Sequence, residues 1–67
     1  MVIILNGQER WLEHPTTVRE LVQLLDLEEG RVAVEVNLEI VDRQQFSNLI
    51  LKESDKVEVI SFVGGGV

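Results

Sequence analysis

The residues of this sequence best suited to chemistry stand at its end, as Gly64-Gly65-Gly66-Val67. Glycine has no Cβ atom and loses the most conformational entropy on folding, so a glycine run at a terminus is expected to be flexible. Such a tail is narrow enough to enter the active site of another enzyme, where a nucleophile could approach a terminal carbonyl group without steric block. The alternatives are a frayed end and a remnant of cloning.

Few side chains could form a catalytic or metal site of the chain's own. The sequence has one His, no Cys and no Tyr, and its serines have no base at a recognised motif spacing. His14 precedes a proline and is interpreted as a surface residue. Glu28-Glu29 shows no metal-ligand spacing, and Glu53 with Asp55 is expected in a solvated turn. We therefore expect no catalytic residue, no metal site and no bound cofactor.

Length and composition restrict the class of protein. With 67 residues, 45% of them hydrophobic, the chain is expected to form one small folded domain. No apolar run approaches the roughly 20 residues of a membrane span, and the N-terminus lacks signal-peptide features, so a soluble cytoplasmic protein is expected. The net charge of −6 opposes nucleic-acid binding. It suits basic protein partners, or it serves solubility alone.

The elements that position the tail begin with a predicted β-hairpin. Residues 2–5 are apolar and rich in β-branched types, and Asn6-Gly7 is typical of the type I′ turn between paired strands. Residues 8–13 are predicted to return as the second strand. Trp11 is interpreted as core or half-buried hairpin packing, with contact to a partner protein as the alternative.

One amphipathic helix is predicted after the hairpin, ending near Asp26. Thr17 and Glu20 have the spacing of a capping box, in which each side chain accepts a hydrogen bond from a free backbone N–H at the helix start. The expected apolar face consists of Val18, Leu21, Val22, Leu24 and Leu25.

The second half of the sequence predicts short strands. Residues 31–37 alternate between apolar and polar types, as a half-buried strand does, and residues 56–63 give the strongest strand pattern. Between them we expect a turn at 37–39, a brief strand at 40–41, a helical turn or loop at 42–46 and a short strand at 49–51. The resulting fold class is α+β, with a mixed sheet packed on one main helix.

Five segments carry a resemblance to a known family. They are Ile4-Leu5-Asn6-Gly7, Thr17-Val18-Arg19-Glu20-Leu21-Val22, Val34-Glu35-Val36-Asn37, Asp55-Lys56-Val57-Glu58-Val59 and Phe62-Val63-Gly64-Gly65-Gly66. In order, spacing and total length, essentially the whole chain resembles the ThiS family of sulfur carriers in thiamine biosynthesis. The resemblance implies a ubiquitin-like β-grasp domain over residues 1–63 and a flexible tail over residues 64–67.

The resemblance also implies a mechanism and partners. An E1-like, ThiF-like adenylyltransferase would use ATP to adenylate the carboxylate of Gly66. A persulfide from a donor such as a cysteine desulfurase would then displace AMP, and the thiocarboxylate would supply sulfur to a ThiG-like thiazole synthase. Gly64 and Gly65 would thread the channels of these partners. The carrier would bind no cofactor itself, because the partner uses the ATP.

Val67 departs from the usual ending of the family. The branched side chain of valine should crowd a glycine-sized channel. Three explanations stay open: Val67 is trimmed to expose Gly66, it is a remnant of expression, or the partner tolerates it. Trimming is favoured because precursors of ubiquitin-like proteins are commonly matured in this way.

The last strand offers a candidate docking surface for the E1-like partner. Alternation places Val57 and Val59 on one face, which is expected to meet the helix, and Glu58, Ile60 and Phe62 on the other. Ile60 and Phe62 would then be partly exposed beside the tail. The alternative is that they pack against a neighbouring strand or Trp11.

Two other functions remain open. One is a MoaD-like small subunit of molybdopterin synthase, or a carrier for another sulfur pathway, which would use the same tail chemistry. The other is a ubiquitin-like module that only binds other proteins and whose tail is inert.

Overall fold

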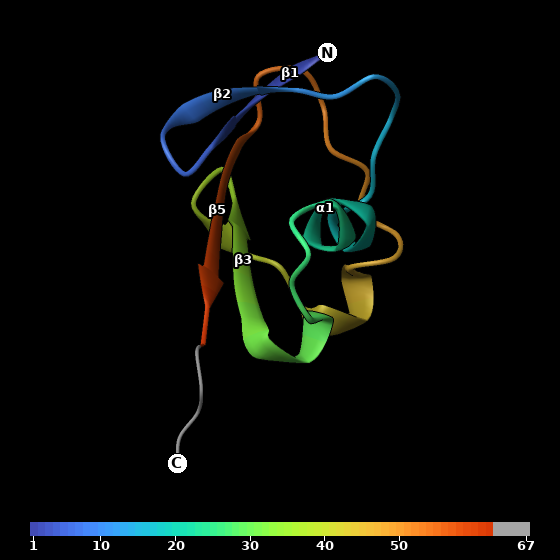
Figure 1. The fold of residues 1–67 in the computed structure, drawn as a ribbon, viewed down its shortest axis with the longest axis vertical. Helices are drawn as coiled ribbons and strands as arrows, with labels where there is room; N and C mark the ends of the chain where they lie inside the picture. Colours follow the sequence, from blue (N-terminus) through green and yellow to red (C-terminus); the bar gives the residue numbers. More distant parts are fainter. Residues whose placement is uncertain (63–67) are drawn as a thin grey trace.

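Five strands form one mixed sheet in the order β2-β1-β5-β3-β4, and one α-helix lies across one face of it (Figure 1). The computed structural model describes residues 1–62. The elements are β1 Val2–Leu5, β2 Gln8–Trp11, α1 Val18–Leu24, β3 Val32–Val36, β4 Glu39–Ile40 and β5 Lys56–Ser61, with short 3₁₀ turns η1 Glu29–Arg31 and η2 Arg43–Gln45. This arrangement confirms the predicted α+β class.

Both hairpins of the sheet close through two-residue turns. Asn6 and Gly7 join β1 to β2, and Asn37 and Leu38 join β3 to β4. The φ angles are 49° and 82° in the first turn and 53° and 74° in the second. Positive φ at both central residues is the signature of the type I′ turn. The hairpin predicted from Asn6-Gly7 is therefore confirmed.

The central strand β5 is held on both sides. It runs antiparallel to β3 along its whole length and parallel to β1 at Ile4↔Lys56 and Leu5↔Val57. Where β1 ends, the side chain of Asn6 continues the pairing. Its Oδ1 accepts a hydrogen bond from the N–H of Val59 at 2.8 Å, and its Nδ2 donates to the carbonyl of Val59 at 3.3 Å.

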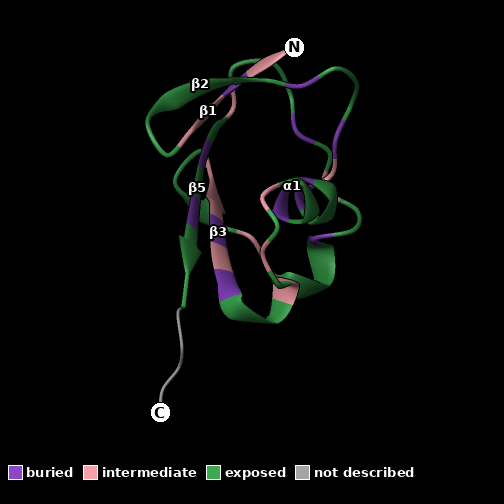
Figure 2. Ribbon diagram, in the orientation of Figure 1, coloured by how far each residue is buried: buried purple, intermediate pink, exposed green. Residues whose placement is uncertain are grey.

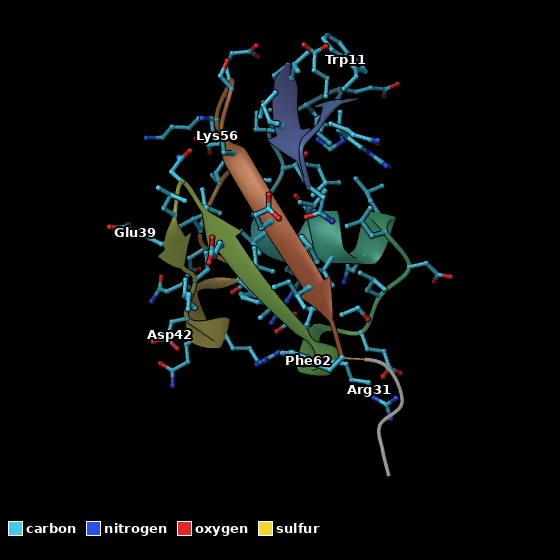
Figure 3. The ribbon with its side chains drawn as sticks, turned by 90° about the vertical axis from the view of Figure 1, so that its left-hand side faces the viewer. Trp11, Arg31, Glu39, Asp42, Lys56 and Phe62 are labelled. Atoms are coloured by element: carbon cyan, nitrogen blue, oxygen red, sulfur yellow. The ribbon has the colours of Figure 1, made fainter. Side chains whose placement is uncertain are left out.

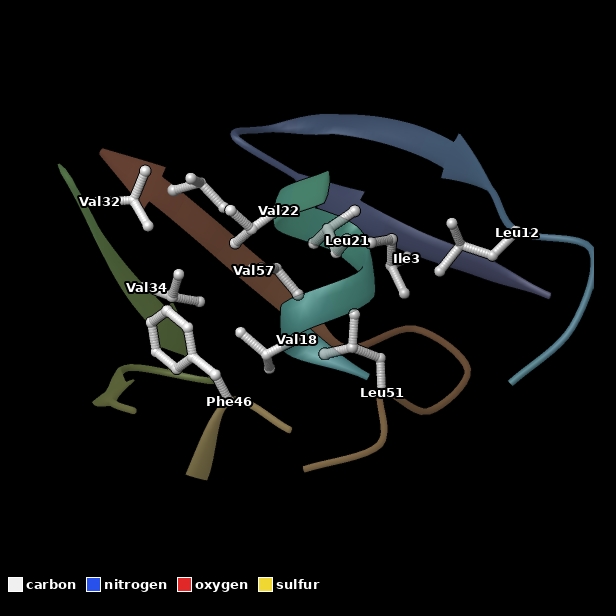
Figure 4. Close-up of a cluster of buried hydrophobic side chains, with 11 residues drawn as sticks. Ile3, Leu12, Val18, Leu21, Val22, Val32, Val34, Phe46, Leu51 and Val57 are labelled. Carbon is white, nitrogen blue, oxygen red and sulfur yellow. The ribbon is translucent and has the colours of Figure 1, made fainter. Parts of the chain in front are cut away.

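The core lies between α1 and the inner face of the sheet (Figures 2 and 4). Its buried residues are Ile3, Leu12, Val18, Leu21, Val22, Val32, Val34, Phe46, Leu51, Val57 and Val59. The helix starts at the predicted capping box, in which the N–H of Glu20 donates to Thr17 Oγ1 at 3.1 Å and the N–H of Thr17 donates to Glu20 Oε1 at 2.9 Å.

Two expectations for the interior are wrong. Leu24 is exposed, because at about 100° per residue it lies roughly 110° from the centre of the face formed by the other apolar helix residues. Residues 49–51 form no strand but a single bridge between Thr17 and Ile50. The segment runs beside the loop that enters α1, and the N–H of Leu51 donates to the carbonyl of Thr16.

Trp11 is also placed differently from the expectation, because 66% of its surface is exposed. It stands on the edge strand β2 opposite Val2, on the face of the sheet that α1 does not cover. Leu12, one residue later, points to the other face and is buried. The interpretation of Trp11 as core or half-buried packing is therefore wrong.

Two arginine side chains, from α1 and from η2, bind the 3₁₀ turn η1. The guanidinium of Arg43 donates to the carbonyls of Glu29 and Val32 and lies over the ring of Phe46, 5.6 Å from its centroid. Arg19 Nε donates to Glu29 Oε1 at 2.7 Å. This hydrogen bond raises the pKa of Arg19 and lowers the pKa of the Glu29 carboxyl group.

Candidate functional site

The C-terminal end of β5 is the part of the structure from which the tail departs. The N–H of Phe62 donates to the carbonyl of Arg31 at 2.8 Å, which fixes the strand against the start of β3. Figure 3 shows Phe62 and Arg31 together at this end of the sheet. Phe62, the last described residue, is therefore held at the end of β5 opposite Lys56.

The predicted tail residues lie beyond the part of the chain that the structure describes. They are Gly64 and Gly65, expected to thread a channel, Gly66, expected to carry sulfur, and Val67, expected to be removed. The predicted boundary between domain and tail, after residue 63, lies there too. These assignments stay predictions.

The two faces of β5 agree with the predicted alternation. Val57 and Val59 are buried under the helix, whereas Glu58, Ile60 and Phe62 are exposed. Ile60 and Phe62 each expose 56% of their surface. The open face of the last strand thus presents two large apolar side chains next to the root of the tail.

The neighbouring strands leave Ile60 and Phe62 uncovered for a clear reason. The residue directly opposite Ile60 on β3 is Ala33, whose side chain is too short to cover it. On the other side, β1 pairs only with the start of β5, and β1 also separates β5 from Trp11 on β2. The expected partial exposure is confirmed, while the docking role of these residues remains untested.

The open face of β5 carries one basic residue, Lys56, and one acidic residue, Glu58. Glu58 stands directly opposite Glu35 in the β3–β5 register, so two acidic residues are cross-strand neighbours on this face. Like charges in such a pair repel each other, and a basic group of a partner would relieve the repulsion. Alternation predicts the two faces of each strand but not how the strands align, so this pair could not be predicted from alternation alone.

Residues 1–62 also contain the predicted surface residue His14, the acidic residues and one α-helix. No group of three His, Asp or Glu side chains in this range is arranged to hold a metal ion. His14 is exposed, as predicted, and its Nδ1 lies 3.1 Å from the carbonyl oxygen of Pro15. The helix of the described region is too short and too polar to cross a membrane.

Comparison with known proteins gives consistent matches over the whole chain. The sequence matches the ThiS family over residues 3–66. It is 35% identical over 63 residues to the sulfur carrier protein ThiS of Bacillus subtilis, covering 92% of this chain and 96% of that protein. The crystal structure of the thiamine biosynthesis protein ThiS from Geobacter metallireducens matches with a TM-score of 0.82 and 32% identity, covering 98% of this chain and 100% of that one. The expected β-grasp fold is confirmed by this structural match.

A further similarity is to a larger protein. The thiazole synthase of Paramagnetospirillum magneticum is 38% identical over 66 residues, which cover 98% of this chain but 20% of that protein. The chain thus spans about a fifth of the length of this relative. A domain similar to this chain is joined there to other sequence in one polypeptide.

Proposed function

The chain belongs to the ThiS family, and we propose that it acts as a sulfur carrier in thiamine biosynthesis rather than as an enzyme. The observation that carries this proposal is the extent of the family match, which continues through all three glycines to Gly66. The exposed apolar pair Ile60 and Phe62 beside the root of the tail supports it further.

In the proposed reaction the carboxylate of Gly66 is the reacting group. An E1-like adenylyltransferase brings ATP, and the carboxylate attacks its α-phosphorus, so that pyrophosphate leaves and an acyl adenylate forms. Persulfide sulfur from a donor such as a cysteine desulfurase displaces AMP. The product is an acyl disulfide, and a thiol then attacks the donor-side sulfur. The donor leaves as a mixed disulfide with that thiol, and the carrier is released as a thiocarboxylate, which supplies sulfur to a thiazole synthase.

The described residues support this chemistry by holding the root of the tail. Phe62 is the last residue that the structure describes, and its N–H donates to the carbonyl of Arg31. Four further residues, when fully extended, reach at most about 14 Å. An active site that accepts Gly66 must therefore open within that distance of β5, which makes the exposed residues beside the tail its natural contact.

We assign that contact to Glu58, Ile60 and Phe62. The apolar pair supplies area to bury, and the acidic Glu58 with Glu35 favours a basic rim on the adenylyltransferase. Val67 would be trimmed before activation, because its branched side chain does not suit a channel that fits glycine.

Intact-mass analysis tests the proposed function. The chain is incubated with ATP, the E1-like enzyme and a sulfur source, and the proposal predicts an oxygen-to-sulfur mass gain on a chain that ends at Gly66. A matched sample without ATP should show no gain. The proposal fails if no thiocarboxylate forms with either the full-length chain or a chain ending at Gly66. A thiocarboxylate on Val67 in protein from the native host would refute trimming alone.

The docking surface has a separate test. Phe62→Ala should weaken binding to the adenylyltransferase about tenfold or more, because apolar anchors near an active site dominate such interfaces. The matched control is Leu24→Ala, which removes an exposed apolar side chain from α1 instead of from the end of β5. This variant should bind as the unmodified chain does. Unchanged affinity for Phe62→Ala, with a lower melting temperature, would show that Phe62 serves the fold instead.

A further inference from the structure

Leu38 combines a positive φ angle with a large exposed apolar side chain. It stands at the second position of the β3–β4 turn with φ of 74°, in the left-handed region that disfavours residues with a Cβ atom. Its side chain is 87% exposed, the highest value among the large hydrophobic residues of residues 1–62. A leucine here therefore strains the backbone and leaves an apolar side chain in water.

The first hairpin of the same chain shows that the fold does not require this leucine. The turn between β1 and β2 has the same length and the same signs of φ, and Gly7 occupies its second position. Nothing in the packing of residues 1–62 makes use of the Leu38 side chain, since the core consists of other residues. Strain retained without benefit to the fold points to a function.

Two more exposed apolar residues line a hollow whose lining also includes Asn37 and Glu39, the chain neighbours of Leu38. Ile40 on the edge strand β4 is 78% exposed, and Ile50 is 54% exposed. The charged residues that line this hollow with them are the acidic Glu39, Asp42 and Asp55 and the basic Lys52. We call Leu38, Glu39, Ile40, Asp42 and Ile50 the hairpin-tip surface. It combines three exposed apolar side chains with two carboxylates, which suits an apolar pocket bordered by arginine or lysine.

The hairpin-tip surface lies far from the tail. Asn37, next to Leu38, pairs with Lys56 at the start of β5, through its N–H to the Lys56 carbonyl at 2.7 Å. Phe62 follows the other end of β5, and Figure 3 shows Lys56 and Phe62 at opposite ends of the strand. Six strand residues place these ends about 17 Å apart. A partner can therefore hold this surface while the tail enters an active site.

We propose that the hairpin-tip surface is a docking site for thiazole synthase, distinct from the tail and from the Ile60–Phe62 surface. This inference rests on the proposed sulfur-carrier function. In one relative, a domain similar to this chain forms 20% of a protein called thiazole synthase. A carrier domain and a synthase can therefore be joined permanently in one polypeptide. In the separate chain, Leu38 supplies that association by inserting into a basic-rimmed apolar pocket of the synthase.

Leu38→Gly tests the inference without endangering the fold. Glycine is the residue type at the second position of the first turn, and it accepts positive φ without strain. The variant should therefore melt at the same temperature or up to about 4 °C higher. Binding to purified thiazole synthase, measured by calorimetry with a chain that ends at Gly66, should weaken at least tenfold. Glu39→Gln should weaken it less and should reduce its dependence on salt. The matched control, Leu24→Ala, should bind as the unmodified chain does.

The outcomes separate this inference from the proposed function. If the unmodified chain becomes thiocarboxylated but Leu38→Gly binds the synthase with unchanged affinity, the docking site is refuted and the sulfur-carrier function stands. Equal loss of affinity in Leu38→Gly and Leu24→Ala would also refute it, because the effect would then not be local. If the unmodified chain forms no thiocarboxylate with ATP, the E1-like enzyme and sulfide, the proposed function itself fails.

Discussion

Replacing Asn6 by alanine should loosen the attachment of the first hairpin to β5. The Asn6 side chain bonds the N–H and the carbonyl of Val59 where β1 has already turned away. Its own backbone has φ of 49°, which asparagine tolerates better than alanine does. The substitution therefore removes two hydrogen bonds and adds backbone strain at the same position.

The expected loss in the free energy of unfolding is the sum of the lost hydrogen bonds and the added backbone strain. A net hydrogen bond is worth about 0.5–1.5 kcal/mol, and the 3.3 Å bond should lie at the weak end, so their loss costs about 1–2 kcal/mol. Alanine in the left-handed region adds about 1 kcal/mol. The total of about 2–3 kcal/mol should lower the melting temperature by about 10 °C or more in a domain of this size.

Urea unfolding, followed by circular dichroism, measures the free energy of unfolding of both forms. Asn6→Gly is the matched control, because glycine accepts positive φ and loses only the side-chain bonds, so it should be less destabilised than Asn6→Ala. The slope with urea should stay unchanged if both variants unfold from the same native state. The reasoning is refuted if Asn6→Ala keeps its stability within about 0.5 kcal/mol of the unmodified chain.

Two further predictions concern the fold. Phe46 is 1% exposed, so Phe46→Ala should lower the free energy of unfolding by about 3–5 kcal/mol, measured by thermal or urea unfolding. Phe46→Leu should lower it clearly less. Equal losses of stability in the two variants would contradict a tightly packed ring. The Arg19 hydrogen bond lowers the pKa of Glu29, so the ion pair stabilises the fold fully above the ordinary pKa of 4.5 and is lost as the pH falls through the lowered value. The urea midpoint should therefore fall less steeply with acid in Glu29→Gln than in the unmodified chain, and identical acid profiles would refute this role.

Local signals in the sequence were sufficient to predict the first turn, the start of the helix and the two faces of the last strand. Asn6-Gly7 predicts its turn because positive φ at both positions restricts the residue types, and Thr17 with Glu20 predicts the helix start because the two bonds are made within four residues. The alternation in residues 56–63 also placed Ile60 and Phe62 on the face away from Val57 and Val59.

The alignment of neighbouring strands, and the features that depend on it, could not be predicted from local signals. Alternation assigns side chains to two faces, but the pairing of Glu35 with Glu58 depends on how β3 aligns with β5. The turn at residues 37–39 was expected, yet the strain at Leu38 depends on which residue falls in its second position once that register is set.

The sequence by itself determined the fold class, the glycine tail and the faces of the last strand, because each depends on neighbours a few residues away. Only the tertiary structure decided which apolar residues the core covers. Trp11 and Leu12 are adjacent and both apolar, yet only Leu12 is buried. One short helix covers a single face of a five-stranded sheet, so an apolar side chain on the other face stays in water until a partner covers it.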